Sequence, residues 1–156
     1  MTLSAVRCKM IRYIEGTQRR ILQIRKFEEG ERSDMYEIVR KEALRPTVTL
    51  YEIKAPLIAK KAQPGQFIIL RVDENGERIP ITINSYELEK GTVTIIVQTA
   101  GATTEKLRHL NEGDCLQDFV GPLGKPTETA GKKKVCVVGG GVGCAIAYPV
   151  LKKFHD

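Results

Sequence analysis

The chain has 156 residues, of which 42% are hydrophobic and 28% are charged, a composition typical of a globular protein. This length allows one domain, or one domain and part of a second, and it is sufficient to bury a core without disulfide or metal cross-links. The formal net charge is +6, but aromatic residues make up only 6% of the chain and tryptophan is absent, which disfavours a base-stacking surface for nucleic acids.

Residues 1–34 are predicted to form a leader or extension with little order. Charged side chains such as Arg7 and Glu15 interrupt every apolar run, so the segment lacks the continuous hydrophobic region of a signal peptide. The Gly-Glu-Arg sequence shortly before Met35 can be encoded by purine-rich codons of the kind found in ribosome-binding sites. We therefore expect translation to start at Met35.

From Met35 onward, short β-branched runs are separated by turn residues. In residues 47–53, for example, apolar and polar side chains alternate with the period of two expected for a half-buried strand. Several short strands at this spacing predict an antiparallel barrel or sandwich, which we place at residues 35–126 and follow with a linker at 127–133. The predicted strands are residues 36–39, 47–53, 66–72, 78–83, 91–98 and 115–120.

One short helix is predicted within this β-domain, at residues 103–110. Leu107 and Leu110 stand about one helical turn apart, Thr103 suits the N-cap, and Glu105 lies in the first turn, where the helix dipole favours an acid. A single short helix does not change the fold class, which stays all-β.

The sequence changes character again after residue 133. Residues 135–138 are wholly apolar, as in a strand buried in a parallel sheet, and the glycine-rich residues 139–143 precede a predicted helix at about 144–154. Glycines cost about 1 kcal/mol each inside a helix, so this stretch is not predicted to span a membrane. Residues 134–156 therefore read as the first βα unit of a Rossmann-like domain, cut short before the unit is complete.

Two glycine-containing turns are candidate phosphate-binding sites. Gly101 precedes Thr103 and Thr104 at the start of the first predicted helix, where free N–H groups, the helix dipole and two hydroxyls favour an anion. The alternative is a capped helix without a ligand. The second turn, residues 139–143, offers the same chemistry after a predicted strand.

The cysteines and histidines give no sign of a metal site. Cys8, Cys115, Cys136 and Cys144 are scattered, without a CxxC pair or a nearby histidine. Scattered cysteines in a chain without a secretory segment are typical of reduced thiols, so we expect a cytoplasmic protein with no bound metal.

In this order, the motifs resemble the ferredoxin–NADP reductase superfamily, in which a flavin-binding antiparallel barrel precedes a nucleotide-binding α/β domain. Within it the chain is most similar to the alpha subunit of NADH-dependent ferredoxin–NADP oxidoreductase and to dihydroorotate dehydrogenase electron-transfer subunits. The resemblance covers residues 35–156. The matching motifs are residues 64–67 (PGQF), residues 80–82 (PIT), Gly101 with Thr103 and Thr104, residues 121–124 (GPLG) and residues 139–143 (GGGVG).

The resemblance implies a Greek-key FAD-binding barrel and assigns its cofactor contacts. The residues implied to line the flavin ring and its ribityl chain are Pro80, Ile81 and Thr82. The residues implied to pass beside the FAD are Ile96, Val97 and Gln98, and those implied to hold its pyrophosphate are Gly101, Thr103 and Thr104. The residues implied to approach the pyrophosphate of NAD(P)H are Gly139, Gly140, Gly141, Val142 and Gly143. Without the resemblance, Ile81, Ile96 and Val97 could equally be barrel core.

Three departures from the family pattern bear on these contacts. Many relatives have arginine where this chain has Ile79, and the side chain of the neighbouring Arg78 should point to the opposite face of the strand. Ala145 and Ile146 replace the usual proline after the glycine turn. The family's iron–sulfur cysteines have no counterpart in this chain.

We therefore expect an FAD-binding electron-transfer subunit or fragment of an NAD(P)H-dependent oxidoreductase, with an incomplete NAD(P)H site and no catalytic side chain of its own. The resemblance implies a larger flavin or iron–sulfur subunit, or a ferredoxin, as the partner. From the composition and the glycine cluster we expect neither nucleic acid nor a membrane as a partner. By itself this chain should not turn over. The alternatives are a small barrel that binds a polyanion and a cofactor-free module that binds a partner protein.

Overall fold

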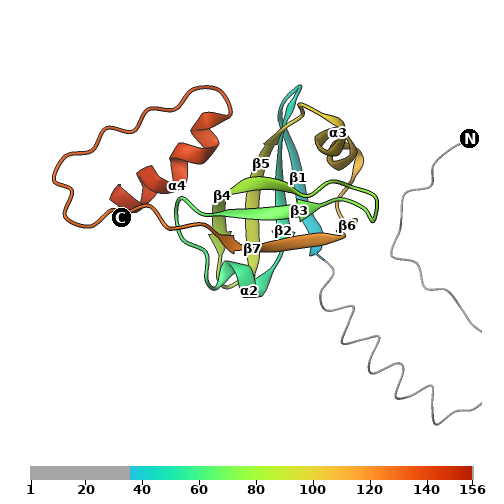
Figure 1. The fold of residues 1–156 in the computed structure, drawn as a ribbon, viewed down its shortest axis with the longest axis horizontal. Coiled ribbons are helices and arrows are strands. Elements are labelled where there is room, and N and C mark those ends of the chain that lie inside the picture. Colours follow the sequence, from blue (N-terminus) through green and yellow to red (C-terminus); the bar gives the residue numbers. More distant parts are fainter. Residues whose placement is uncertain (1–35, 156) are drawn as a thin grey trace, which may run out of the picture.

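The computed structural model describes residues 36–155, which form a curved antiparallel sheet with three helices (Figure 1). The antiparallel barrel fold predicted from the sequence is confirmed. The predicted leader at residues 1–34 lies outside the described residues. The strands are β1 (Tyr36–Arg45), β2 (Val48–Lys54), β3 (Phe67–Arg71), β4 (Ile79–Glu87), β5 (Thr92–Gln98), β6 (Cys115–Leu116) and β7 (Asp118–Leu123), and the helices are α2 (Pro56–Ala59), α3 (Ala102–His109) and α4 (Gly143–His155).

The order of strands across the sheet is β6-β1-β2-β5-β4-β3-β7, and all the pairs are antiparallel. Pairing of β2 with β5, which skips two intervening strands, gives the Greek-key connectivity. The sheet begins with β6 and ends with β7, yet only Gln117 separates these two strands in the chain. The two edges of the sheet must therefore lie side by side, and the N–H of Gln117 donates to the carbonyl of Arg71 on β3 at 3.0 Å.

The single strand predicted at residues 115–120 is therefore wrong in one respect. Residues 115–116 pair with β1, whereas residues 118–123 pair with β3 on the opposite edge. One continuous strand cannot serve both edges, so the chain bends at Gln117. No local sequence signal marks this bend, because it arises from long-range pairing.

The core fills the inside of the curved sheet. Along β2, β3 and β5, buried side chains alternate with half-buried or exposed ones, as expected for strands with one face toward the core. The fully buried large side chains are Ile38, Tyr51, Ile53, Ile68, Leu70, Ile83, Val93, Ile95, Leu107, Leu116 and Phe119. Leu116 and Phe119 flank the bend at Gln117, so both edges of the sheet contribute to the same core.

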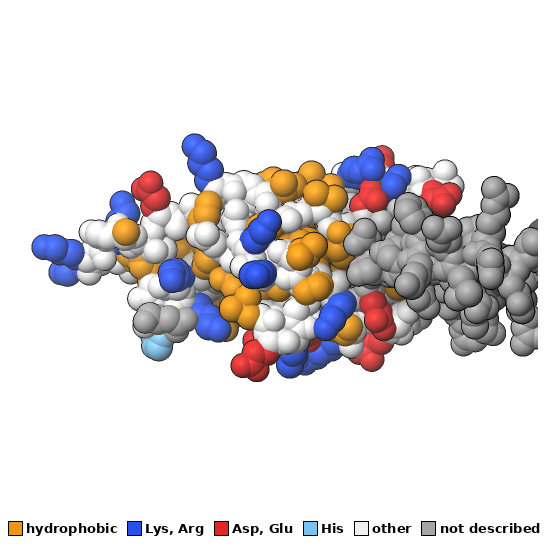
Figure 2. Space-filling model, turned by 90° about the horizontal axis from the view of Figure 1, so that it is seen from below, with side chains coloured by type: hydrophobic (Ala, Val, Ile, Leu, Met, Phe, Trp, Pro, Cys, Tyr) orange, Lys and Arg blue, Asp and Glu red, His pale blue; other side chains and the backbone are white. Residues whose placement is uncertain are grey.

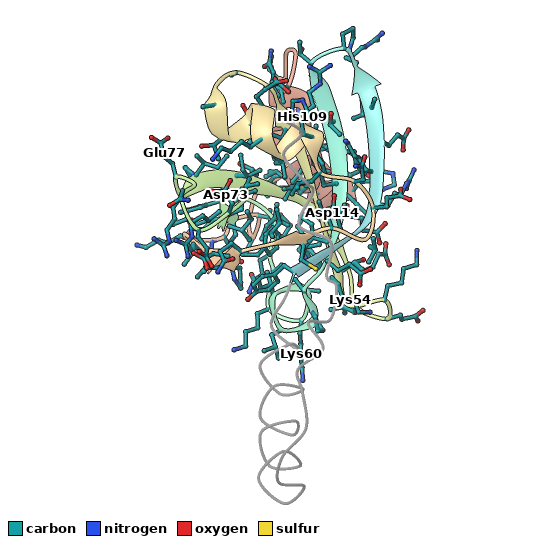
Figure 3. All side chains as sticks on the ribbon, turned by 90° about the vertical axis from the view of Figure 1, so that its right-hand side faces the viewer. Lys54, Lys60, Asp73, Glu77, His109 and Asp114 are labelled. Atoms are coloured by element: carbon teal, nitrogen blue, oxygen red, sulfur yellow. The ribbon has the colours of Figure 1, made fainter. Side chains whose placement is uncertain are left out.

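Helix α3 covers one end of the barrel (Figures 1 and 3). Its residue Leu107 is fully buried, and the Leu107 carbonyl accepts a hydrogen bond from the Tyr51 hydroxyl at 3.3 Å. Burial raises the pKa of Tyr51, so this hydroxyl stays protonated and keeps donating. On the outer side of the helix, Lys106 Nζ lies 2.9 Å from Asp73 Oδ2 in the β3–β4 connection.

The single-turn helix α2 was not predicted. With Pro56 at its first position and only four residues, it lacks the length for a hydrophobic period to show in the sequence. Ile58 and Ala59 are buried beneath the barrel, and the preceding Ala55 donates to the Gly91 carbonyl at 2.9 Å.

The predicted strand at residues 135–138 does not form. These residues have no assigned helix or strand, and Val138 is 87% exposed. A parallel-sheet strand needs neighbours for its amides and carbonyls, and no described strand pairs with this segment. Helix α4 does form and contacts β4, where Asn84 Nδ2 donates to the carbonyl of Ala145 at 2.8 Å. Of the predicted βα unit, only the glycine turn and the helix are present.

Replacing Phe119 tests the barrel closure. Phe119→Ala should lower the free energy of unfolding by about 3–5 kcal/mol, because it leaves a cavity in the core where the two sheet edges meet. Its neighbour Val120 is 51% exposed, so Val120→Ala should change stability by only about 0.5 kcal/mol. Equilibrium denaturation in urea measures both variants, and equal losses would contradict a closed barrel.

Candidate functional site

A small cleft of about 200 Å³ lies on the outer face of β4 and β5, next to the start of α3 and under the start of α4. It brings together residues from four separate segments of the chain. The cleft is lined by Pro80, Ile81, Thr82, Ile96, Val97, Gln98, Thr104, Val142, Ala145 and Ile146. It thus contains all six residues that the sequence predicts beside the flavin, and one of the three predicted at its pyrophosphate.

Because successive side chains on a strand point to opposite faces, these residues do not all face the cleft to the same extent. On β5, Val97 is only 4% exposed and belongs to the core, whereas Ile96 and Gln98 lie on the outer face. On β4, Ile81 packs partly against the core, while Pro80 is exposed and Thr82 half-buried. Val97 is therefore a residue of the barrel core, Ile81 belongs to the core in part, and Ile96 does not belong to it.

The start of α3 leaves several backbone N–H groups free. The amides of Ala100 and Gly101 donate to Thr104 Oγ1 at 2.9 and 3.0 Å, and this hydroxyl donates in turn to the Gly101 carbonyl at 2.9 Å. Among the described residues, no acceptor is found for the amides of Ala102, Thr103 and Thr104. These three amides lie where the positive end of the helix dipole favours an anion.

Thr103 and Gly101 have different places in this turn. The side chain of Thr103 is buried, so it can offer a ligand only its backbone amide. A Cβ added to Gly101 would meet no atom within 4 Å, which means that the turn borders open space. The candidate phosphate seat is therefore made of main-chain groups and the Thr104 hydroxyl.

The cations nearest to the predicted site along the sequence are engaged elsewhere. Arg78 Nη2 lies 2.8 Å from Asp118 Oδ2, so its side chain is directed toward β7. Lys106 is held by Asp73, and this hydrogen bond lowers the pKa of the Asp73 carboxyl, with smaller contributions from nearby charges and the Asn75 amide. Figure 3 shows Asp73 beside α3. Neither Arg78 nor Lys106 is thus placed to act for the arginine that the family resemblance leads us to expect at position 79.

The glycine turn at residues 139–143 has largely internal hydrogen bonds. The amides of Gly143, Cys144 and Ala145 donate to carbonyls three residues earlier, at 2.9, 3.2 and 3.0 Å. Gly141 has a φ of +55°, a conformation that favours glycine. At Gly139, an added Cβ would come within 3.1 Å of the Cys144 Cα, so this glycine permits close contact between turn and helix.

Of the five predicted NAD(P)H residues, two line the clefts. Val142 lines the small cleft, and Gly141 and Val142 line the larger cleft described next. Gly139, Gly140 and Gly143 line neither cleft.

A large cleft of about 900 Å³ adjoins the small one. The two clefts share Ile96, Gln98, Val142 and Ala145. The large cleft is lined by Leu44, Arg45, Thr47, Val48, Asn84, Ile96, Gln98, Gly141, Val142, Cys144, Ala145 and Tyr148. The β1–β2 turn was not predicted as part of a site, because it lies between predicted strands that were assigned no ligand contact. Asn84 and Tyr148 were not predicted either, because α4 docks on β4 only in the folded chain.

The remaining surface gives little support to other kinds of site. In the part of the chain that the structure describes, no group of His, Cys, Asp and Glu could hold a metal ion, and no helix is long and apolar enough to cross a membrane. On the face in Figure 2, Lys and Arg side chains are scattered among apolar and uncharged groups. A polyanion-binding surface needs clustered basic residues, so this face does not favour the polyanion alternative.

Comparison with known proteins finds clear relatives over most of the chain. The chain is 50% identical over 129 residues to an uncharacterized protein of Clostridium beijerinckii encoded in the adh 3′ region, covering 78% of this chain and 44% of the relative. It is 43% identical over 120 residues to the dihydroorotate dehydrogenase B (NAD(+)) electron transfer subunit homolog of Thermotoga maritima, covering 77% of this chain and 43% of the relative. The chain thus spans less than half the length of these relatives. No protein-family model matches it.

Solved structures give the same result. NADH-dependent reduced ferredoxin-NADP oxidoreductase matches with a TM-score of 0.76 and 41% identity, over 78% of this chain and 44% of that chain. The ferredoxin reductase of carbazole 1,9a-dioxygenase matches with a TM-score of 0.67 and 19% identity, over 76% of this chain and 37% of that chain, which shows a shared fold.

The Asp73–Lys106 contact predicts a measurable titration. The pKa of Asp73 should lie below its ordinary value, and Lys106→Ala should raise it toward that value, because the hydrogen bond from Lys106 favours the carboxylate. Stability from this pair is thus present above the ordinary pKa and is lost as the pH falls through the lowered one. NMR titration of the Asp73 carboxyl measures the shift. The exposed Lys60, far from α3 in Figure 3, supplies the control Lys60→Ala, which should leave this pKa unchanged.

Proposed function

This chain belongs to the ferredoxin–NADP reductase superfamily, and we propose that it is the FAD-binding part of an electron-transfer flavoprotein that takes electrons from NAD(P)H. The chain covers less than half of its relatives' length, so the activity of the whole protein is part of this proposal.

The small cleft is the observation that carries the proposal. Its predicted flavin contacts come from β4, from β5 and from the start of α3, segments that are separated by turns and long connections. No local pattern could place them together, yet the barrel collects them around one opening. The meeting of these residues at one cleft, next to the start of α3, is what supports the proposal.

The residues present fit FAD in their chemistry. The free amides of Ala102, Thr103 and Thr104 would hold the diphosphate, with Gly101 leaving space for it. Pro80, Thr82 and Ile96 would border the ring system. The small cleft alone is below the range of about 300–1,000 Å³ typical of small-molecule sites, so the ligand would also need space in the adjoining large cleft.

The chain itself would contribute binding, orientation and exclusion of water. A bound flavin would supply the redox chemistry, namely hydride acceptance from a nicotinamide and release of single electrons to an iron–sulfur centre. Among the described residues that line the two clefts there is no Asp, Glu, His or Lys, and Arg45 is the one charged residue. Residues 139–143 would take part in NAD(P)H binding once the rest of a nucleotide-binding domain packs against them.

The exposed side of α4 suits contact with further protein. Ile146, Tyr148 and Leu151 are each about half exposed, at 51%, 48% and 52%. We propose that a larger flavin or iron–sulfur subunit, or a ferredoxin, receives the electrons. We also propose a cytoplasmic location, because scattered cysteines without a pairing motif are typical of reduced thiols.

FAD binding by the purified full chain tests the proposal. The chain should quench the fluorescence of added FAD, and Thr104→Val should weaken binding about tenfold, because it removes a hydroxyl and loosens the turn that presents the free amides. Thr94→Val, on β5 outside both clefts, is the matched control and should bind FAD like the unchanged chain. A folded wild-type chain that leaves FAD fluorescence unchanged at high micromolar concentrations would overturn the proposal.

A further inference from the structure

We propose that Arg45, the last residue of β1 before the β1–β2 turn, binds the diphosphate of the dinucleotide and supplies a cation to that site. This inference rests on the proposed FAD function. It concerns a residue that the family motifs in this sequence do not include.

The β1–β2 turn lies against the segment that leads into α3. The amide of Thr99 donates to the carbonyl of Thr47 at 2.8 Å, and Thr99 is two residues before Gly101. Val48 pairs with Gln98 at the same end of the sheet. Figures 1 and 3 show this end of the β1–β2 hairpin and α3 at the same end of the barrel. Arg45 therefore lies at the end of β1, two residues before Thr47, whose carbonyl is bonded to the segment that leads into α3.

Gln98 connects Arg45 with the phosphate seat. Arg45 and Gln98 both line the large cleft, and Gln98 and Thr104 both line the small one. A ligand that extends from the small cleft into the large one passes Gln98 and comes to the side of the turn where Arg45 lies. Because the small cleft holds only about 200 Å³, an extended dinucleotide has to use this route.

The distribution of charge singles out Arg45. It is the one charged residue among all those that line the two clefts, and neither cleft contains an acidic residue. Within the described chain, Arg45 is exposed and has no ion-pair partner. The other cations around α3 already have partners. Lys106 pairs with Asp73 and Arg108 with Glu105. Lys41 Nζ donates to the carbonyls of Arg108 and Leu110.

An arginine suits this task better than the free amides alone. Its planar guanidinium presents several donors in a fixed fork that matches phosphate oxygens, and its charge remains at every relevant pH. The three α3 amides provide directional hydrogen bonds but no full positive charge. A diphosphate carries two negative charges, so a cation that approaches from the hairpin side complements the amides.

The experiment compares FAD with riboflavin, which has the same ring and ribityl chain but no phosphate. Arg45→Ala should weaken FAD binding about ten- to a hundredfold and leave riboflavin binding unchanged, because only the charge-assisted phosphate contact is lost. Arg45→Lys should restore part of the loss. Arg40→Ala, which removes the same charge from the same strand at an exposed ion pair with Glu42, should leave both affinities unchanged.

The possible outcomes separate the two proposals. If the wild-type chain binds FAD and Arg45→Ala binds it equally well, the role of Arg45 is overturned while the FAD function stands. Equal weakening of FAD and riboflavin in Arg45→Ala would also overturn it, since the effect would then be structural. Weaker binding of NADH with unchanged binding of FAD would assign Arg45 to the other dinucleotide and overturn the inference as stated. A wild-type chain that binds no FAD would overturn both proposals.

Discussion

The bend at Gln117 is the constraint on which the rest of the structure depends. One residue separates a strand on the first edge of the sheet from a strand on the last edge, so the sheet has to curve until its edges meet. Closure gives the chain an inside, filled by side chains such as Phe119 and Leu116, and an outside on which alternate residues stay accessible. A flat sheet with the same strands would have neither a single core nor a sheltered end for α3.

The candidate site follows from this closed geometry. Strands β4 and β5 are neighbours, so their outer residues form one wall, and the chain leaves β5 directly into the turn that starts α3. The phosphate seat is consequently placed at the end of the wall that would border a flavin. Because α3 is held from within by Leu107 and from outside by Lys106, the direction of its free amides is fixed before any ligand arrives. Preorganisation of this kind lowers the cost of binding.

In the C-terminal segment, by contrast, residues with a local preference for a strand have no described strand to pair with. Residues 135–138 have the composition of a buried parallel strand, but a strand needs a second strand to bond its backbone, and none of the described strands does so. Helix α4 makes most of its hydrogen bonds within itself and therefore forms, while the Ala145 carbonyl, four residues before Pro149, accepts from Asn84 instead. The helix also docks on the barrel, where Asn84 donates a hydrogen bond to it. Its apolar side chains form one wall of each cleft.

The sequence by itself determined most of the strands, the short helix at Thr103 and the glycine turns, because alternation, caps and turn residues are local signals. The residues expected beside the flavin came from the family resemblance instead. The sequence could not reveal that Val97 faces inward while Ile96 faces the cleft, that the strand at Cys115 breaks at Gln117, or that residues 135–138 stay unpaired. Only the tertiary structure decided these points, and it alone brought Arg45 to the same cleft as Gln98. The reason is physical: strand pairing, closure and helix docking are contacts between residues far apart in the chain, and their free energies do not depend on the local pattern that each segment carries.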